Sequence, residues 1–539
     1  MKNSYKVIIT TSGTGSRLGE VTHFLNKALV RVGKKAAISY ILDQIPAEVP
    51  IVVTVGYKKE QVKEFLLFAH PERRFEFVEV DKYEGEGSSL GYSLLCAAPL
   101  LQCPFVYVTC DTLFSMPITF PDTNWMGIAR HADAHHYMSV QLNGMGFIDQ
   151  IFSKGAGKFD AVYIGLAAIS HYASFWSHLS ALYSQNPYDQ SLNDVRAFSA
   201  MQEEGLLFEG KYVHNWLDIG NEHSLQQARL QITDPFDNLE KLDESIYLFE
   251  GQFVIKFFHD PLLVKKRIAR AKQLDSLVPK IEKEGDNFYR YQYVQGKLFS
   301  QVVNAQNIKT LLAWCQNYLW KPVDLDRQEK ESFQKHCHHF YFEKSVARIN
   351  QFYEISHVRD RSCSINEQTI PSLADLFSMI DWERMRDGTA TGFHGDLHFE
   401  NIILGKGTFH LLDWRQDFDG LIAYGDIYYD LAKLNHGMIV SHEMVRKNLF
   451  HIEIGDDQEK NIHCEILRPD SLVLCQQAFY HFLKEEGFDI YKVDILTALI
   501  FLNSAPLHLF PYSLFLHFFG RLRLWYALSH HPAQIPLFM

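Results

Sequence analysis

The sequence predicts an α/β protein with two domains, the first built on a mostly parallel sheet and the second mainly helical. Three observations support this prediction. The chain has 539 residues, too many for one module at roughly 100–200 residues per domain. Short β-branched runs alternate with helical segments in its first half, which is the pattern of a sheet covered by helices. A polar segment that contains a proline, residues 234–238, then follows a helical segment and predicts a boundary after residue 235.

Composition limits the class of protein. Hydrophobic residues make up 47% of the chain and charged residues 22%, which is typical of a folded globular protein. The net charge of −12 disfavours nucleic acid as a partner. The eight cysteines include no Cys-x-x-Cys pair, and the N-terminus has no signal-peptide pattern, so we expect a cytoplasmic protein.

Each element of the first half has its own signal. Strands are predicted where β-branched and aromatic residues form short runs, and helices where apolar residues recur at helical spacing. The predicted strands cover 7–11, 51–55, 75–80, 105–109 and 161–169, and the predicted helices cover 36–44, 59–68 and 221–230.

A glycine-containing loop, residues 12–19, follows the first strand. Gly13 and Gly15 allow backbone N–H groups to approach phosphates closely, and Arg17 adds a cationic side chain. Lys27 follows ten residues later. Two cations near such a loop favour a nucleoside triphosphate over a dinucleotide, although a Gly-x-Gly turn alone is also common for steric reasons.

These residues resemble the sugar-nucleotide pyrophosphorylase and small-molecule nucleotidyltransferase family. The resemblance extends to Asp111, directly after the strand 105–109, to Asp218 in the segment Trp216–Gly220, and to the loop around Gly87. It implies a Rossmann-like nucleotidyltransferase domain over residues 1–235.

The resemblance also implies roles for single residues. Asp111 and Asp218 would bind Mg²⁺, while Arg17 and Lys27 would be catalytic and would hold the phosphates. Gly13, Gly15 and Gly87 would contact the nucleotide, and Lys154 and Gly165 the substrate. Either aspartate taken alone could equally be a helix cap or a loop carboxylate.

The second half begins with a predicted hairpin, 246–249 and 253–258, and continues through a strand near 289–294 into helices. A strand-turn-strand feature is predicted at 402–412. Residues 495–519 contain no Asp, Glu, Lys or Arg, but two prolines and several polar residues interrupt them. This pattern favours two buried helices joined by a turn over a membrane-spanning helix.

The segment His394–Asn401, followed by Asp413, is the most specific motif of the chain. It resembles the catalytic loop of the aminoglycoside phosphotransferase and choline/ethanolamine kinase family. The resemblance implies that Asp396 is the catalytic base, that Asn401 and Asp413 bind Mg²⁺, and that Lys256 contacts ATP. It also implies a two-lobed, protein-kinase-like domain over 236–539, with a small lobe at about 240–300 and a helical large lobe at about 301–539.

Asp426 follows in a segment that begins a helix in that family, and we expect it to be structural rather than chemical. The helix predicted over 262–277 offers no glutamate to pair with Lys256, which leaves open an altered ATP site.

Together the two resemblances imply a bifunctional enzyme. ATP would phosphorylate a small hydroxylated substrate, and a second nucleoside triphosphate would then cap that phosphate. The product would be an activated precursor for surface polysaccharide or capsule. We favour a sugar or polyol as substrate, with choline or ethanolamine and CTP as an alternative. The sequence does not select among CTP, UTP, GTP and dTTP, and a homo-oligomer is possible.

Two further alternatives stay open at this point. The second half could be a pseudokinase that binds a ligand or builds an oligomer, or the whole chain could be a structural interaction protein. No transmembrane segment is expected in any of these cases.

Overall fold

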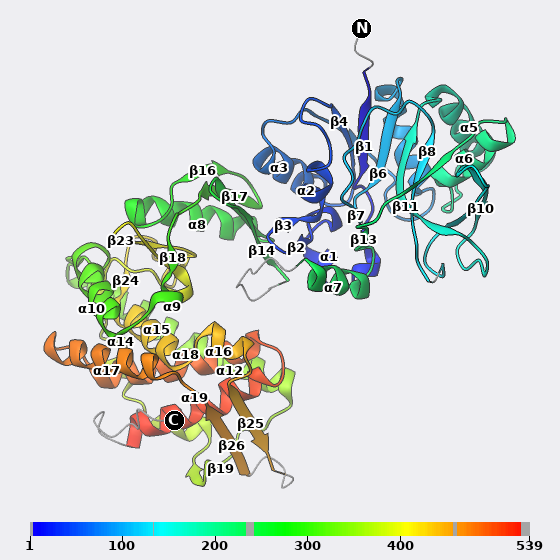
Figure 1. Ribbon diagram of the computed structural model, residues 1–539. Helices are drawn as coiled ribbons and strands as arrows, with labels where there is room; N and C mark the ends of the chain where they lie inside the picture. Colours follow the sequence, from blue (N-terminus) through cyan, green and yellow to red (C-terminus); the bar gives the residue numbers. More distant parts are fainter. Residues whose placement is uncertain (1–3, 133, 233–241, 456–460, 530–539) are drawn as a thin grey trace. The chain divides into compact units, whose positions relative to one another are not determined.

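The computed structural model describes residues 4–132, 134–232, 242–455 and 461–529 (Figure 1). The chain divides into two compact units: residues 1–261 together with 283–290, and residues 262–282 together with 291–539. The predicted boundary segment at 234–238 lies outside the described residues. The predicted hairpin that follows it belongs to the first unit, not to the second.

The first unit contains a mixed sheet with the strand order β10-β9-β11-β6-β1-β4-β5, to which β8 and β12 are added. The predicted parallel strands are confirmed, since β1 pairs in parallel with both β4 and β6, and β4 with β5. β11 is antiparallel to β6. The strands are β1 (Lys6–Thr10), β4 (Ile51–Val55), β5 (Phe75–Glu79), β6 (Phe105–Thr109), β8 (Trp125–Ala129), β9 (Ser139–Leu142), β10 (Ile148–Phe152), β11 (Ala161–Ile169) and β12 (Glu209–Tyr212).

Helices border this sheet on both sides (Figure 1). The helices of the first unit are α1 (Val21–Phe24), α2 (Ala37–Leu42), α3 (Lys59–Ala69), α4 (Leu90–Ala97), α5 (Tyr172–Gln185), α6 (Asp194–Glu203) and α7 (Glu222–Gln231). Successive residues of a strand point to opposite faces, so Val7 and Ile9 belong to one buried apolar cluster and Ile8 to another. The sheet is therefore covered on both faces, as the near-continuous apolar runs of its strands predict.

The hairpin of β14 (Glu244–Phe249) and β15 (Phe253–Phe258) forms as predicted. Its first strand packs on the first unit through Tyr247, which is fully buried and donates a hydrogen bond to the Leu29 carbonyl at 2.7 Å. The Tyr247 ring also meets the Phe65 ring of α3, with 4.8 Å between centroids. Glu64 of α3 accepts hydrogen bonds from the backbone N–H groups of Asn287 and Phe288. These contacts explain why the hairpin and residues 283–290 belong to the first unit.

The second unit is mainly helical. Its longer helices are α8 (Pro261–Leu274), α10 (Ala305–Trp314), α11 (Arg327–His338), α12 (Lys344–Ser356), α15 (Ile427–Ile439), α17 (Asp470–Glu485), α18 (Ile490–Ser504) and α19 (Tyr512–Ser529). The predicted strand-turn-strand feature is β22 (Ile402–Gly405) and β23 (Thr408–Leu411). A sheet that we did not predict contains β19 (Cys363–Ile365), β20 (Gln368–Ile370), β25 (Phe450–Ile454) and β26 (Asn461–Ile466).

The apolar stretch 495–519 forms two packed helices, α18 and α19, joined by a short 3₁₀ turn, as predicted. In the described residues, one helical stretch, Ile490–Leu507, is long and apolar enough to cross a membrane, and 67% of it is buried inside the protein. All eight cysteines are free thiols.

Candidate active sites

The first site begins where β1 ends and the chain turns through residues 12–19. Gly15 adopts a left-handed conformation with φ 71°. A Cβ at this position would lie 3.0 Å from the Cβ of Lys27 and from a methyl group of Thr22. The glycine therefore allows the loop to turn directly against the stem of Lys27.

The two predicted metal-binding aspartates come together through a short strand pair. Asp111 follows β6, and the next residues, β7 (Thr112–Leu113), pair antiparallel with β13 (Leu217–Asp218), in a register that places Thr112 opposite Asp218. The backbone N–H of Ile219 donates a hydrogen bond to the Asp111 carbonyl at 3.0 Å. This pairing joins two acidic residues that are far apart in the sequence.

The side chains of Asp111, Asp218 and Arg17 surround one small space beside Gly220. A Cβ at Gly220 would lie 3.1 Å from Oδ1 of Asp218, 3.4 Å from Oδ2 of Asp111 and 3.4 Å from a guanidinium nitrogen of Arg17. Lys27 Nζ lies 3.1 Å from Oδ2 of Asp111. Two carboxylates that face the same space fit the preference of Mg²⁺ for oxygen ligands.

The charges of this site stabilise one another. Burial alone would raise the pKa of Asp111, but Lys27 and Arg17 outweigh burial and lower it. Burial alone would lower the pKa of Lys27, but Asp111 and Cys110 together outweigh burial and raise it. Burial and the charge of Arg17 lower the pKa of Lys154. Asp111 and Lys27 are therefore both ionised at neutral pH.

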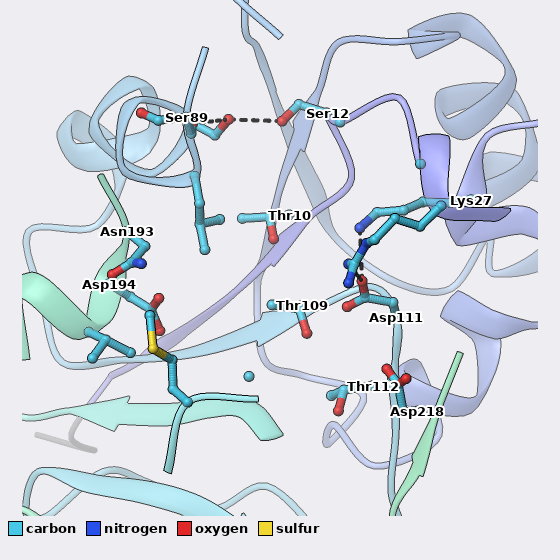
Figure 2. A pocket seen from close by; sticks show the side chains of 18 of the residues that line it. Thr10, Ser12, Lys27, Ser89, Thr109, Asp111, Thr112, Asn193, Asp194 and Asp218 are labelled. Carbon is cyan, nitrogen blue, oxygen red and sulfur yellow. Dashed lines mark hydrogen bonds and ion pairs between the residues drawn. The ribbon is translucent and has the colours of Figure 1, made fainter. Parts of the chain in front are cut away.

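These residues line a cavity of about 500 Å³ in the first unit. Lys27, Asp111 and Asp218 lie on one side of it, and Asn193 and Asp194 on the other (Figure 2). The cavity brings together eight residues predicted from the sequence: Gly13, Gly15, Arg17, Lys27, Asp111, Lys154, Gly165 and Asp218. Gly87 is not among the lining residues, but its neighbour Ser88 is.

Sequence reasoning missed Asp194, the first residue of α6. Its side chain is 3% exposed and accepts a 2.6 Å hydrogen bond from the Tyr163 hydroxyl. Burial raises the pKa of Asp194 to about 6. The sequence signal, Asn193 and Asp194 at the start of a helix, is typical of a helix cap. Asn193 does cap α6, with its side chain accepting from the Arg196 N–H.

We expect Asp194→Asn to change how stability depends on pH. The folded-state pKa of about 6 exceeds the ordinary value of 3.8, so the protonated carboxyl favours folding at low pH, and this contribution disappears as pH rises through 6. Between pH 4 and pH 7 the wild type should lose about 2 kcal/mol relative to the variant, since most of the pKa shift takes effect in this range and one pKa unit corresponds to about 1.4 kcal/mol. Thermal unfolding of both proteins at several pH values in this range measures the difference in stability. A stability that depends on pH in the same way in both proteins would contradict the prediction.

The second predicted motif lies entirely in the second unit. The Asp430 carboxylate on α15 accepts hydrogen bonds at 2.7 Å from the backbone N–H groups of His394 and Gly395, which fixes the loop against the helix. Asn401 donates to the Asp396 carbonyl at 3.0 Å. Asp396 Oδ1 lies 2.8 Å from Nζ of Lys433.

The charges around Asp396 keep it ionised. Burial alone would raise the pKa of this carboxyl, but Lys433 and His398 hold it well below the usual value. Burial would likewise lower the pKa of His398, yet Asp396 and Glu400 raise it to about 9.

Asp413 lies close to Asn401 because β22 and β23 pair and the Leu412 N–H donates to the Asn401 carbonyl at 2.7 Å. Asp413 adopts a left-handed backbone conformation with φ 53°. Its Oδ1 accepts a 3.0 Å hydrogen bond from Arg267 of α8, which also bonds to the Trp414 carbonyl. The sequence predicted that this helix, α8, offers no glutamate to Lys256. The structure shows that α8 instead places Arg267 against Asp413, a predicted metal ligand, and the sequence did not suggest this pairing.

Two other predicted residues lie elsewhere. Asp426 caps α15 through the Tyr428 N–H and forms a fully buried ion pair with Lys492 at 3.0 Å, so it has the structural role that we expected. Lys256 is a buried residue of β15 and belongs to the first unit, whereas Asp396, Asn401 and Asp413 belong to the second.

No protein-family model and no curated protein matches this chain. Among solved structures, a Bacillus anthracis protein assigned provisionally as a glucose-1-phosphate thymidylyltransferase is 21% identical over 44% of this chain and 98% of its own, with a TM-score of 0.37. The CTP:phosphocholine cytidylyltransferase of Streptococcus pneumoniae is 18% identical over 43% of this chain and 100% of its own, with a TM-score of 0.37. The inositol-1-phosphate CTP transferase of T. maritima is 17% identical over 43% and 98%, with a TM-score of 0.34. Because these values are low, the functional assignment depends on the geometry of the sites.

Proposed function

We propose that the first unit transfers a nucleotidyl group from a nucleoside triphosphate to the phosphate of a small molecule and releases pyrophosphate. One observation carries this proposal: two carboxylates and two cations, from segments far apart in the sequence, meet on one side of a cavity of about 500 Å³. A cavity of this size accommodates small-molecule ligands such as a nucleotide. Paired acids and cations are what a reaction between two phosphates requires, since it depends on neutralising charge.

In the proposed reaction, an oxygen of the acceptor phosphate attacks the α-phosphorus of the triphosphate. A new P–O bond forms, the bond to the β-phosphate breaks, and its electron pair leaves with pyrophosphate. No general base is needed, because the attacking phosphate oxygen is already anionic. Catalysis then consists of alignment and charge neutralisation.

The residues of the cavity divide these tasks. Asp111 and Asp218 would hold Mg²⁺, which when bound neutralises the charge that develops on the phosphates. Arg17 and Lys27 hold and orient the triphosphate, and the glycines of the loop let backbone N–H groups approach it. Lys154, which also lines the cavity, binds the acceptor phosphate.

Lys154→Met is expected to raise the KM for the phosphorylated acceptor about 10- to 100-fold, as expected for the loss of one hydrogen bond to a charged group. The KM for the nucleoside triphosphate should change little. Initial rates of pyrophosphate release at varied concentrations of each substrate measure this, with Lys158→Met, an exposed lysine nearby, as the control. An increase confined to the triphosphate KM would assign Lys154 to the other substrate.

We propose further that the second unit is a phosphotransferase that supplies this acceptor phosphate from ATP. Asp396 accepts the proton of a substrate hydroxyl whose oxygen attacks the γ-phosphorus, and ADP leaves with the electron pair of the broken bond. Asn401 and Asp413 would bind Mg²⁺ on the ATP phosphates. The support is the ordered loop in which Asp430 fixes the backbone and Asn401 is bonded to Asp396.

The two activities form consecutive steps, since the first product is the second acceptor. This order is consistent with a cytoplasmic enzyme that prepares activated sugars or polyols for surface polysaccharide or capsule. The pseudokinase alternative gains some support from Arg267. This side chain donates a hydrogen bond to Oδ1 of Asp413, an oxygen that would otherwise bind Mg²⁺.

The full-length protein tests both steps together. Sugars, polyols and amino alcohols are incubated with ATP, Mg²⁺ and each nucleoside triphosphate in turn, and ADP and pyrophosphate are measured separately. We expect ADP with one class of acceptor, and pyrophosphate only when its phosphorylated product and one matching triphosphate are present. Absence of pyrophosphate with every phosphorylated acceptor would refute the transferase assignment.

A further inference from the structure

Four cationic side chains of the second unit lie within interaction range of one another, and one of them pairs with Asp396. Lys344 lies at the start of α12, Arg348 one turn later, Arg415 two residues after Asp413, and Lys433 on α15. We call these four residues the cationic cluster. None of them was predicted from the sequence as part of a site.

The members of the cationic cluster lie within interaction range of one another. Lys344 interacts electrostatically with each of the other three and with Asp396. Arg415 interacts in the same way with Arg348 and with Lys433. Lys433 forms the 2.8 Å ion pair with Asp396. The cluster is therefore joined to the proposed catalytic base through Lys433 and interacts with it through Lys344.

Aromatic rings hold two of these cations together. Nζ of Lys344 lies 4.0 Å from the centroid of the Phe340 ring, and the guanidinium of Arg415 lies 4.9 Å from the same centroid. Both also lie within about 6 Å of the Tyr429 ring. A ring face attracts a cation without cancelling its charge, so this arrangement concentrates positive charge beside Asp396.

The positive charge of the cluster is not balanced within the described part of the chain. Lys433 pairs with Asp396, and among the described residues no ion pair joins Lys344, Arg348 or Arg415 to a carboxylate. Burial and the neighbouring cations lower the pKa of Lys344 well below its usual value. Such crowding of like charge is costly unless an anion relieves it.

We propose that the substrate phosphorylated in the second unit is an anion, a hydroxylated carboxylate or phosphate whose acidic group binds the cationic cluster while its hydroxyl faces Asp396. This inference rests on the proposed phosphotransferase function and names its substrate class. Transfer proceeds as described above, with the hydroxyl proton passing to Asp396 and the γ-phosphoryl group to the hydroxyl oxygen. Choline and ethanolamine, which are cations, would be repelled by the cluster.

Matched acceptors of different charge test the substrate class. The full-length protein is assayed for ADP formation with glycerate against glycerol, glycerol 3-phosphate against glycerol, gluconate against glucose, and choline. We expect the anionic member of at least one pair to have a kcat/KM at least about 100-fold higher, because each charge-assisted hydrogen bond contributes about 1.5–3 kcal/mol. Preference for neutral acceptors or for choline would overturn the inference, and the carboxylate and phosphate pairs distinguish the two anion sources.

A binding measurement separates this inference from the phosphotransferase proposal. The anionic acceptor that reacts best, or inorganic phosphate if none reacts, is titrated into the protein without ATP, and binding is followed by calorimetry. Lys344→Met and Arg348→Gln should weaken binding at least about 10-fold, the equivalent of about 1.4 kcal/mol. Asp396→Asn should strengthen it by removing the one negative charge. Lys330→Met, on the exposed surface of α11, serves as the control.

The combined outcomes are distinct. If no acceptor of any charge yields ADP but anions bind through the cluster, the phosphotransferase proposal fails and the anion site stands. If neutral acceptors yield ADP and the cluster variants bind anions as the wild type does, the anion inference fails and the phosphotransferase stands. Melting curves of each variant show that it is folded, and Arg348→Gln, whose position is partly exposed, provides a second variant should Lys344→Met unfold.

Discussion

Asp218→Asn is expected to lower the rate of nucleotidyl transfer by about 1,000-fold, the size of effect seen when one preorganised electrostatic group is lost from an active site. Asn keeps the shape of Asp and can still accept the hydrogen bond that the Gly220 N–H donates to Oδ1 at 3.1 Å. The change therefore removes a charge and a strong metal ligand while leaving the local backbone in place. Pyrophosphate release with a phosphorylated acceptor measures the loss.

A raised requirement for Mg²⁺ should accompany this loss, because a neutral amide is a weaker ligand than a carboxylate. Asp149→Asn, at an exposed position of β10, is the matched control and should retain full activity. Wild-type rates in Asp218→Asn at every Mg²⁺ concentration would show that this residue is a structural carboxylate and that the proposed metal site is wrong.

Asp396→Asn is expected to lower ATP-dependent phosphorylation of the acceptor by about 1,000-fold, because general-base catalysis contributes roughly 10²–10⁴-fold. The variant retains the shape of the side chain and leaves the Asn401 hydrogen bond to the Asp396 carbonyl unaffected. ADP formation under saturating ATP and acceptor measures the loss.

The nucleotidyl transfer activity of the same variant serves as an internal control. When the phosphorylated acceptor is supplied directly, Asp396→Asn should release pyrophosphate at the wild-type rate, since the residues proposed for that step belong to the first unit. Unchanged ADP formation in Asp396→Asn would show that Asp396 is not the catalytic base and would remove the phosphotransferase assignment, and loss of both activities would indicate unfolding.

The first site could be assembled from the sequence because sheet topology determines where loops meet. β1 and β6 are parallel neighbours, so the loops that follow them, with Arg17 and Asp111, lie at one edge of the sheet. Local apolar runs are enough to predict such strands. Asp218 required more, since only the family resemblance suggested that this distant residue would share a metal site with Asp111.

Contacts between distant segments explain what the sequence did not reveal. The pairing of Arg267 with Asp413, and of Tyr163 with Asp194, depends on the final packing of helices and strands. The unpredicted sheet did leave a local signal, because Ile462, Cys464 and Ile466 alternate with polar residues along β26 and are buried. That alternation is typical of a strand with one covered face.

The position of the domain boundary was the feature that was hardest to predict from the sequence. A polar segment with a proline predicts a linker, but the Tyr247 side chain beyond it is fully buried and bonded to the Leu29 carbonyl. Whether a hairpin packs on the preceding or the following part of a chain depends on surface complementarity that no local pattern encodes.

The path of the backbone between the two units limits how the protein can be dissected. The chain leaves the first unit after residue 261, re-enters it for residues 283–290 and leaves again, so no single proteolytic cut yields both halves intact. A fragment ending at 235 would lack Tyr247 and expose the Phe65 ring, and it should be prone to aggregation.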